Sequence, residues 1–535
     1  MRNLSLLDFI TAPSFAPALK PAVPTLLLGT LAAVFSGISM LTGLWGIIRF
    51  IGHVSAYWVI FSLLFLMLAA VFTALSSWLV HSAEAGFSAR LRRQVASHLM
   101  HLAATTRSKQ SEQHLKRLLV DDISALHHMV AHLPAEVATF VVVPLLSIVL
   151  LLHWVGLAAL WILLPGALAS LYYLIVVPYV SKRDGAARMQ VMLDIIAAAD
   201  DYARGIRDYR IYGQQASALS AYRESAQNFT SRMVSWVAKV ATLAALATAL
   251  LQAGATFAIA YWVAHAYDNI TLAAALFFSL AIVTPALRLG HGLDYVTAGR
   301  AAATRLSLFF KEPVLVSGDI QHIQNSADFE IIDATMCIDD QVLFESLNHQ
   351  FQAGTITAIT GPSGIGKTTL LRILAGLERL NQGAVRYANT DMSHWHEQLR
   401  HAQILFVPQG GDVLPTTVRE NLTLALNETD DAQLKRALSK VQLNVSLDAD
   451  ASLLSGGEKQ RMNMARAFLS SASIILLDEP TSALDQNNAA QLMQELQAFA
   501  KNQHKTIVMV THDLALAATA DQKIALEGVA GGNKA

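Results

Sequence analysis

Residues 361–369 read Gly-Pro-Ser-Gly-Ile-Gly-Lys-Thr-Thr and directly follow the apolar run Ile356–Thr360. A strand, a glycine-rich loop and a helix in this order are typical of a loop that binds phosphate groups. Gly361, Gly364 and Gly366 allow backbone N–H groups to face phosphate oxygens, and the helix that follows presents its positive end to them. A chance glycine-rich turn is the alternative, but the spacing and the flanking elements both favour phosphate binding.

Two side chains of this loop and two acids further along the chain have the chemistry for phosphoryl transfer. We expect Lys367 to reach the β and γ phosphates of ATP and Thr368 to bind Mg2+. The run at 474–480, Ile-Ile-Leu-Leu-Asp-Glu-Pro, predicts a buried strand that ends in two carboxylates, at the edge where open α/β sheets bind ligands. Asp478 suits the magnesium site, and Glu479 suits polarising the attacking water. Taken alone, this acid pair could equally begin an ordinary helix or turn.

The composition indicates that part of the chain lies in a membrane. Of 535 residues, 53% are hydrophobic and 15% are charged, whereas soluble domains carry about 25% charged residues. The net charge of −1 does not suggest nucleic acid as a partner, and the single cysteine, Cys337, excludes an intramolecular disulfide framework. The first 20 residues lack the features of a signal peptide, so we expect the N-terminus to stay uncleaved.

Apolar runs that can cross a bilayer, about 20 residues each, occur only before residue 310, at 24–48, 57–80, 134–153, 155–180, 241–266 and 271–290.

Two long polar stretches, 81–133 and 181–239, separate these runs and are rich in arginine and lysine. The positive-inside tendency places both stretches in the cytoplasm, and an even number of spans then leaves both termini there. Apolar residues recur at helical spacing, as at Leu115, Leu119 and Ile123, which predicts helices that continue beyond the membrane. Solvated loops are the alternative. We therefore expect a multi-pass protein of the inner (cytoplasmic) membrane.

From about residue 330 the sequence pattern changes, and short β-rich runs alternate with helical segments. Runs at 356–360, 404–407, 474–477 and 507–510 predict the strands of a mainly parallel sheet. The sequence therefore predicts a polytopic α-helical membrane domain of six helices fused to an α/β P-loop NTPase domain. We expect these parts, joined by a linker, at 1–310, 311–327 and 328–535.

Residues 454–461, Leu-Ser-Gly-Gly-Glu-Lys-Gln-Arg, open a predicted helix and resemble the signature motif of the ATP-binding cassette (ABC) family. Serine and glycine amides at a helix start form an anion site, which in this family closes on ATP held by the opposite subunit. Other positions follow in the family's order: Gln409 resembles the Q-loop glutamine, 482–485 the D-loop and His512 the switch histidine. A lone glutamine or histidine would more often be structural. The resemblance implies the catalytic residues Glu479, His512 and Gln409, the magnesium ligands Thr368, Gln409 and Asp478, and the ATP-binding residues Gly361, Pro362, Ser363, Gly364, Ile365, Gly366, Lys367, Thr368, Thr369, Ser455, Gly456, Gly457 and Asp485.

The sequence departs from the family pattern in two places. The family usually stacks an aromatic side chain on adenine some two dozen residues before the phosphate-binding loop, but 335–338 reads Thr-Met-Cys-Ile. We considered Met336, Cys337 and Phe344 as replacements. The segment at 445–452, before the signature motif, is shorter than in typical family exporters, so the usual contact there with the membrane domain is not implied.

The membrane half resembles the six-helix, type IV exporter fold of the ABC family. Its coupling helices, which would transmit closure of the ATPase domains, correspond to 106–122 and 200–215 in this sequence. The run at 115–134 further resembles half-transporters that import ferric siderophores in bacteria, of the yersiniabactin and mycobactin type. The short first external loop at 52–56 fits that subgroup, although many exporters share these features.

The resemblance implies an ATP-driven transporter that hydrolyses ATP, uses ATP and Mg2+ as cofactors and acts as a dimer with a second half-transporter, identical or similar. We expect membrane lipid and a small-molecule substrate as further partners, and no nucleic acid. Import of ferric siderophores is the first hypothesis, and export of drugs, peptides, lipids or thiols is the second. A non-transport ABC ATPase and a regulatory subunit are remote alternatives.

Overall fold

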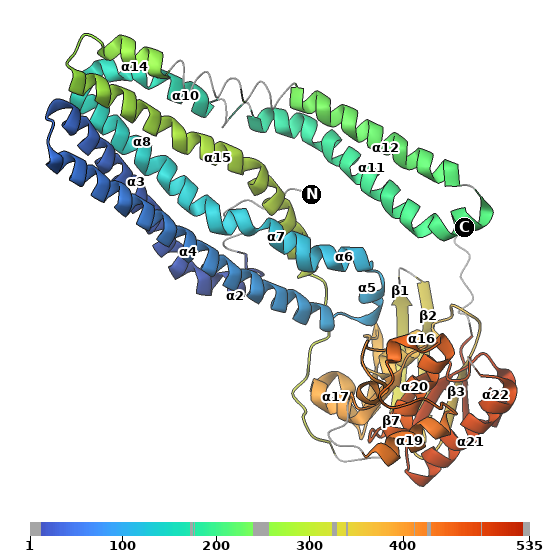
Figure 1. The fold of residues 1–535 in the computed structure, drawn as a ribbon. Coiled ribbons are helices and arrows are strands. Elements are labelled where there is room, and N and C mark those ends of the chain that lie inside the picture. Colours follow the sequence, from blue (N-terminus) through green and yellow to red (C-terminus); the bar gives the residue numbers. More distant parts are fainter. Residues whose placement is uncertain are drawn as a thin grey trace. The chain divides into compact units, whose positions relative to one another are not determined.

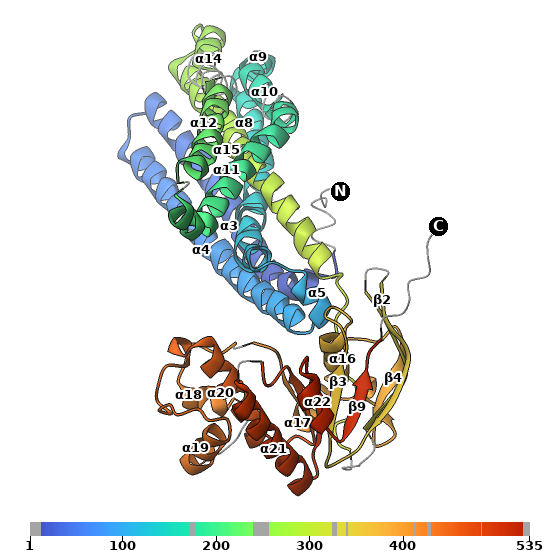
Figure 2. The same ribbon diagram turned by 90° about the vertical axis from the view of Figure 1, so that its right-hand side faces the viewer.

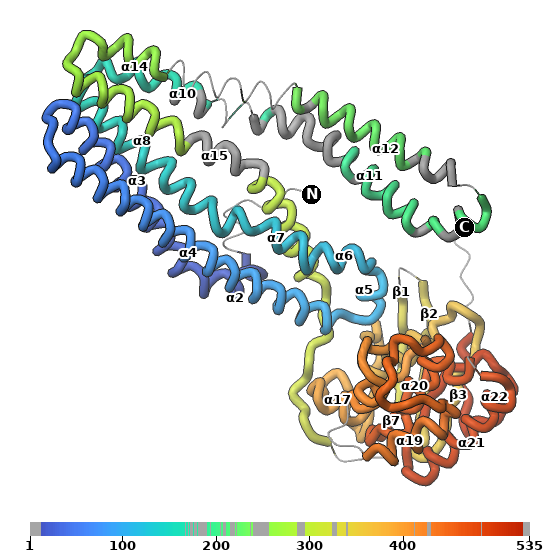
Figure 3. Tube along the Cα trace, in the orientation of Figure 1, coloured from blue at the N-terminus to red at the C-terminus, as the bar shows by residue number. Residues whose placement is uncertain are grey.

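The computed structural model divides the chain into two compact units, one formed by Met1–Ser97 with Glu112–Lys311 and the other by His98–Ser111 with Glu312–Ala535. Figures 1 and 3 follow the chain through both units, coloured along the sequence. The short segment His98–Ser111 groups with the C-terminal part, although it lies between helices of the first unit. The described residues are 12–171, 175, 177–213, 215–238, 245, 256–323, 329–338, 341–410, 412–424, 430–482 and 484–527.

The described part of the first unit is helical. Among the described residues, three helical stretches are long and apolar enough to cross a membrane, Ala16–Gly52, Ala56–Met100 and Glu112–Ile162, and they contain the first three predicted runs. The helices are α2 Ala16–Leu19, η1 Lys20–Ala22, α3 Val23–Gly52, α4 Ala56–Met100, α6 Glu112–Lys116, η2 Arg117–Asp122, α7 Ile123–Ala125, η3 His128–His132, α8 Leu133–Val155, η4 Gly156–Ala158, α9 Ala159–Ile162, α10 Leu164–Leu171, α11 Val177–Tyr212, α12 Gln215–Trp236, α14 Thr256–Ala264 and α15 Asn269–Phe309.

The other three predicted runs are only partly described, so the number six stays a prediction. The run at 155–180 begins where α8 ends, at Gly156 with φ +69°, and continues as the short helices α9 and α10. Most of the run at 241–266 lies outside the described residues. The run at 271–290 belongs to α15, whose apolar part is Asn269–Pro285.

The helices of the first unit pack through apolar and small residues. Leu41 and Ile48 of α3, Leu151 of α8 and Phe278 of α15 belong to one buried cluster. On α3, Gly43 lies so close to α4 that an added Cβ would stand 2.9 Å from Leu66. Small residues permit such close approach of helices where lipid provides no hydrophobic drive.

The described parts of the polar stretches 81–133 and 181–239 are mostly helical, which confirms the prediction from their periodicity over the alternative of solvated loops. The helix α4 continues to Met100, and α11 and α12 lie side by side in both Figure 1 and Figure 2. Between α4 and α8, the segments η2 and η3 are π-helical. The buried Asp122 of η2 accepts hydrogen bonds from Nε and Nη2 of Arg305 on α15 at 2.5–3.1 Å, a bidentate pair that fixes this segment against α15.

The second unit contains a five-stranded parallel sheet in the order β6-β7-β8-β3-β9. The four predicted strands are confirmed, and each is rich in buried Ile, Val, Leu or Met, as expected for strands covered on both faces. Because β7, β8 and β3 are neighbours, their carboxyl ends meet at one edge. The strands are β3 Ile356–Thr360, β6 Ile404–Val407, β7 Ile474–Asp478, β8 Thr506–Val510 and β9 Gln522–Ala525.

A second sheet of four strands, in the order β2-β1-β4-β5, is antiparallel and was not predicted. Phe329 on β1 pairs with Phe351 on β2, and their rings stack with centroids 4.9 Å apart inside the core. The strands are β1 Phe329–Ile338, β2 Gln341–Phe351, β4 Gln382–Tyr387 and β5 Thr390–Asp391. The helices of this unit are α5 Ala104–Ser108, α16 Lys367–Leu374, η8 Met392–His394, α17 Glu397–Gln403, α18 Val418–Leu422, α19 Asp431–Lys440, η9 Ala451–Leu453, α20 Gly456–Leu469, α21 Gln486–Asn502 and α22 Leu514–Thr519.

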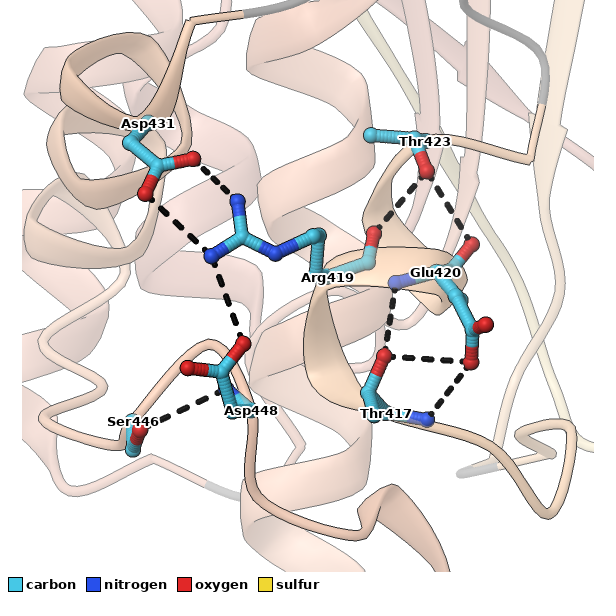
Figure 4. A network of polar contacts seen from close by, with 7 residues as sticks. All are labelled: Thr417, Arg419, Glu420, Thr423, Asp431, Ser446 and Asp448. Carbon is cyan, nitrogen blue, oxygen red and sulfur yellow. Dashed lines mark hydrogen bonds and ion pairs between the residues drawn. The ribbon is translucent and has the colours of Figure 1, made fainter.

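A polar network surrounds α18 (Figure 4). Thr417 and Glu420 form a capping box at the start of this helix. The guanidinium of Arg419 pairs with Asp431, at the start of α19, and with Asp448. The Arg419 side chain is 36% exposed and those of its partners are 50% and 79% exposed. Exposed ion pairs contribute little to stability, so the network mainly orients α18.

The strongest polar anchor of α18 is the fully buried amide of Asn421. Its Oδ1 accepts from Leu414 N at 2.9 Å and Arg466 Nη2 at 3.0 Å. Its Nδ2 donates to Leu414 O, Thr416 Oγ1 and Thr417 O at 3.0–3.1 Å. The side-chain amide therefore uses both its oxygen and its nitrogen.

We predict that Asn421→Leu lowers the free energy of unfolding by about 3 kcal/mol, because it leaves buried donors and acceptors unpaired. Thermal unfolding of the full chain in detergent should show a midpoint several degrees lower. Asn444→Leu, at an exposed position, should leave the midpoint within about one degree. Equal midpoints for both variants would contradict this account of α18.

Candidate functional site

The phosphate-binding loop joins β3 to α16 and depends on glycine at two positions. Gly361 has φ +146°, and an added Cβ would stand 2.7 Å from the carbonyl oxygen of Leu526. Gly366 has φ +102° directly before the first residue of α16. The loop therefore has a backbone shape that side chains would obstruct, and it leads into a helix N-terminus.

Lys367 is 6% exposed, and its Nζ donates to the carbonyl oxygens of Gly361 and Pro362 at 2.9 and 2.7 Å. Burial lowers the pKa of this ammonium group, while the nearby carboxylates of Glu479 and Asp478 act in the opposite direction. The loop thus holds a cation among its own carbonyl groups, where phosphate oxygens would be stronger partners.

Asp478 ends β7 and is 3% exposed. Burial raises the pKa of its carboxyl group, and the Thr368 hydroxyl beside it partly offsets this shift. Among the described residues, neither carboxylate oxygen of Asp478 has a hydrogen-bond partner of good geometry. Buried carboxylate oxygens without donors, next to a hydroxyl, have the chemistry of a hard-cation site, and Mg2+ therefore fits these residues.

Three of the predicted site residues form one hydrogen-bonded group. Gln409 Nε2 donates to Glu479 Oε2 at 2.7 Å, and His512 Nε2 lies 2.9 Å from Glu479 Oε1. Glu479 has φ +51°, a strained value for a residue with a side chain. Such strain persists where the surroundings impose it, often at functional sites. The arrangement fixes the Glu479 carboxylate at the carboxyl edge of the parallel sheet.

Gln409, Glu479 and His512 face a cavity of about 420 Å³ that Lys367 also lines. Met336 and Phe344, which we considered for adenine, are each 4% exposed and belong to the hydrophobic core instead. They pair across β1 and β2, next to register shifts that interrupt the regular alternation of these strands. The cavity is lined by Ile338, Gln341, Leu343, Ser363, Gly364, Gly366, Lys367, Thr368, Thr369, Gln409, Glu479 and His512. Ile338 and Leu343 provide its apolar wall.

The signature residues Ser455, Gly456 and Gly457 are not among the residues that line this cavity. Ser455 caps α20 in a capping box with Glu458, and its Oγ lies 2.7 Å from Glu458 Oε2. Hydrogen bonding from Ser455 lowers the pKa of the Glu458 carboxyl group. Asp485 also lies outside the lining and caps α21 through Asn488. One chain thus gathers the phosphate-loop residues but leaves the signature residues apart from them.

Gln460 of α20, which the motifs did not mark as a site residue, connects two parts of the site. Its Nε2 donates to the backbone oxygen of Glu479 at 3.0 Å and to Ser482 Oγ at 2.9 Å. Gln460 follows the signature glycines within the motif at 454–461, so the sequence places it near the site. The sequence does not reveal that its partners are Glu479 and Ser482. Gln460 links the signature helix to the strained residue at the end of β7.

The segment 98–111, which belongs to the second unit, contacts the rest of that unit through the N-terminus of α5. Thr105 donates from its backbone N and its Oγ1 to Glu378 Oε2 at 2.8 and 2.6 Å, and Ala104 N donates to Leu377 O at 2.9 Å. The first coupling helix was expected at 106–122, so the docking residues begin slightly earlier. A carboxylate at a helix start satisfies free N–H groups, which explains the position. Part of the second expected helix, 200–215, lies outside the described residues.

The model of the family described as ABC transporter matches residues 344–482. The mycobactin import ATP-binding/permease protein IrtA of Mycobacterium tuberculosis is 26% identical over 490 residues, 86% of this chain and 55% of that protein. The bacitracin export ATP-binding protein BceA of Halalkalibacterium halodurans is 35% identical over 187 residues, 33% of this chain and 74% of that protein. The chain therefore spans about half the length of the mycobactin import proteins that it matches.

Two further similarities cover almost the whole chain. A probable ABC transporter ATP-binding/permease protein of Haemophilus influenzae is 25% identical over 526 residues, 94% of each chain. A bacterial Atm1-family ABC exporter solved with ATP bound has a TM-score of 0.71 and 20% identity, and the match covers 95% of this chain and 94% of that one. The second similarity concerns the fold alone and confirms the predicted fold class.

Proposed function

This chain belongs to the ABC transporter family, and on that premise we propose that it is half of an ATP-driven dimeric importer of ferric siderophores. The single observation that supports ferric siderophores as the substrate is the similarity to mycobactin import proteins over 86% of this chain, which includes the membrane part. The run at 115–134 points in the same direction. Export of drugs, peptides, lipids or thiols is the competing outcome of the experiment below.

The proposed ATPase chemistry uses the grouped residues of the cavity. Lys367 binds the β and γ phosphates, and the loop from Gly361 to Thr369 provides its backbone N–H groups. Thr368, Asp478 and Gln409 are the residues that would hold Mg2+, which when bound supplies charge neutralisation at the phosphate oxygens. The Glu479 carboxylate orients and polarises the attacking water, while Gln409 and His512 hold this carboxylate in place.

The proposed transporter is a dimer because one chain leaves the ATP site incomplete. Ser455, Gly456 and Gly457 lie outside the cavity that the phosphate-binding loop lines. We infer that the corresponding residues of a second chain close on the γ-phosphate, while those of this chain complete the other site. The partner is an identical chain or a similar half-transporter, and Asp485 lies near the contact.

We infer that the protein crosses the inner (cytoplasmic) membrane several times, with the ATPase part and both termini in the cytoplasm. The arginine- and lysine-rich stretches 81–133 and 181–239 support this orientation. ATP binding would then close two ATPase parts on the cytoplasmic side, and the segment that contains α5 would carry this movement to the membrane helices. Hydrolysis resets the cycle.

Accumulation of radiolabelled ferric siderophores by iron-starved cells tests the proposal. Cells with the intact protein should accumulate label, and cells with Glu479→Gln at equal expression should not. If uptake is equal in both strains while efflux of a dye or peptide slows in the variant, the import hypothesis is wrong and export replaces it. Lysates with equal amounts of membrane-inserted protein provide the expression control.

We predict that Glu378→Ala uncouples ATP hydrolysis from transport, because it removes the acceptor for two hydrogen bonds of Thr105. Losing a charged acceptor with two donors should lower transport about tenfold, while ATPase activity stays within about twofold since Glu378 does not line the cavity. Glu345→Ala, at an exposed position of β2, is the matched control. Equal transport by both variants would exclude this contact as a route of coupling.

A further inference from the structure

One wall of the ATP cavity consists of residues that take no part in the phosphate chemistry. The phosphate-binding loop and the residues grouped around Glu479 line most of the cavity, and the remaining lining residues are Ile338, Gln341 and Leu343. Leu343 packs directly on the loop, since an added Cβ at Gly366 would stand 3.1 Å from the Cβ of Leu343. A nucleotide whose phosphates occupy the loop would therefore place its base against these three side chains.

Ile338, Gln341 and Leu343, which we call the base wall, form one strip on the hairpin of β1 and β2. Ile338 pairs with Gln341 across the two strands, and directly paired residues have their side chains on the same face. Leu343 follows Gln341 by two residues, so it shares that face. Leu343 is 7% exposed, Ile338 is half-buried and Gln341 is exposed. The base wall thus has two aliphatic side chains and one exposed amide.

Among the described residues of the second unit, no phenylalanine, tyrosine or tryptophan lines the ATP cavity. The residues of this unit outside the described ranges are of other types. The imidazole of His512 lines the cavity, but its Nε2 lies 2.9 Å from Glu479 Oε1, among the residues of the phosphate chemistry. The aromatic residues that lie in or pack against the hydrophobic cores of this unit are Phe329, Phe344, Phe351, Tyr387, Trp395, Phe406, Phe468 and Phe499.

An aliphatic wall holds a purine base without distinguishing one purine from another. Apolar contact scales with the area that is covered, and adenine and guanine have the same fused rings. Strong discrimination requires hydrogen-bonding groups that match one base and are left unpaired by the other. The amide of Gln341 has both an acceptor oxygen and a donor nitrogen. Because Gln341 is exposed, its amide can rotate to accept from the amino group of adenine or to donate to the carbonyl oxygen of guanine.

We propose that this site hydrolyses GTP as well as ATP, with the base wall holding either purine by apolar contact. The inference rests on the proposed ATPase function and adds the class of nucleotide to it. With either nucleotide, the oxygen of water bonds to the γ phosphorus while the bond from that phosphorus to the β–γ bridging oxygen breaks. The products are the nucleoside diphosphate, inorganic phosphate and a proton. The base takes no part in this step.

Phosphate release by the purified full-length protein in detergent, with MgATP or MgGTP, tests the proposal. The value of kcat/KM for GTP should lie within about fivefold of that for ATP, because no fixed hydrogen bond separates the two bases. Competition of ATP and GTP for labelling by an azido-ATP measures the same preference if turnover is slow. A preference for ATP beyond about tenfold would overturn this inference and leave the ATPase function intact. Absence of both hydrolysis and labelling would contradict the ATP site itself.

Changes at Gln341 should shift the preference in opposite directions. Gln341→Glu can only accept, which suits the amino group of adenine, and Gln341→Lys can only donate, which suits the carbonyl oxygen of guanine. The ratio of kcat/KM for ATP to that for GTP should rise about fivefold in the first variant and fall about fivefold in the second. This ratio cancels any uniform effect of the new charge on the triphosphate. An unchanged ratio in both variants would overturn the assignment of the base wall.

Ile338→Tyr should lower KM for both nucleotides about fivefold, because an aromatic ring stacks on any base. Val342→Tyr is the matched control. Val342 lies between Gln341 and Leu343 in the same strand, is 38% exposed and does not line the cavity, so the same ring on the other face should leave both KM values unchanged. Equal KM values for Ile338→Tyr and the native protein would contradict the position proposed for the base.

Discussion

Glu479→Gln should lower the ATPase rate of the purified protein by about 10²- to 10⁴-fold, the range expected when a positioned general base is lost. The amide has the size of the carboxylate and can still accept the hydrogen bond that Gln409 donates to the native side chain. It cannot attract a proton from the attacking water. ATP binding should therefore persist while hydrolysis fails, which phosphate release and nucleotide-binding assays measure separately.

The matched control is Glu495→Gln, a change of the same chemistry in α21. Glu495 is 38% exposed and pairs with Lys440, and it does not line the ATP cavity. Its ATPase rate should stay within about twofold of the native rate, because exposed ion pairs contribute little. If Glu479→Gln also keeps its rate within that range, Glu479 does not act on the water and another group must be sought.

Gly456→Asp should lower ATPase activity by about 100-fold or more, comparable to the loss of an oxyanion-stabilising donor. Apart from its own helix, an added Cβ at Gly456 meets no atom of the described residues within 4 Å, and an acid in the first turn of a helix is favourable to that helix. The chain should therefore fold normally. The new carboxylate would lie in the anion site proposed for the γ-phosphate of the opposite chain and would repel it.

Gly456→Ala tests whether charge or bulk causes that loss, since alanine adds only the Cβ. We expect Gly456→Ala to retain most of the activity and Gly456→Asp to lose it, with equal thermal unfolding midpoints for both. Photolabelling with an azido-ATP should still mark the phosphate-binding loop of Gly456→Asp. Full ATPase activity of Gly456→Asp would contradict the proposal that two chains share each ATP site.

Local patterns in the sequence predicted the parallel sheet well. The strand before the phosphate-binding loop is a continuous apolar run with Gly361 directly after it, and β3 occupies that run as predicted. The same holds for β6, with both ends as predicted. Each strand is short, buried on both faces and followed by a recognisable motif, so neighbouring residues suffice to place it.

The antiparallel sheet could not be predicted from the sequence pattern, because β1 is irregular. Its pairing with β2 shifts between Ile331 and Ala334 and again before Met336. Asp333, inside this region, has φ +45°. Bulges interrupt the two-residue alternation that identifies a half-buried strand. The inward positions of Met336 and Phe344 follow only once this pairing is known.

Contacts between residues that are distant in the sequence also could not be predicted. Thr105 and Glu378 are 273 positions apart, and neither belongs to a motif. The helical pattern between residues 115 and 126 was recognised, but periodicity did not separate an α-helix from the π-helical turns η2 and η3.

Transport by the purified protein in sealed vesicles tests the central claim most directly. Vesicles loaded with radiolabelled ferric siderophore receive ATP and Mg2+ outside, so that only molecules with outward-facing ATPase parts work. Import towards the ATPase side predicts ATP-dependent release of label into the medium, absent with Glu479→Gln. ATP-dependent accumulation of external label inside the vesicles, or no movement despite active hydrolysis, would contradict the account.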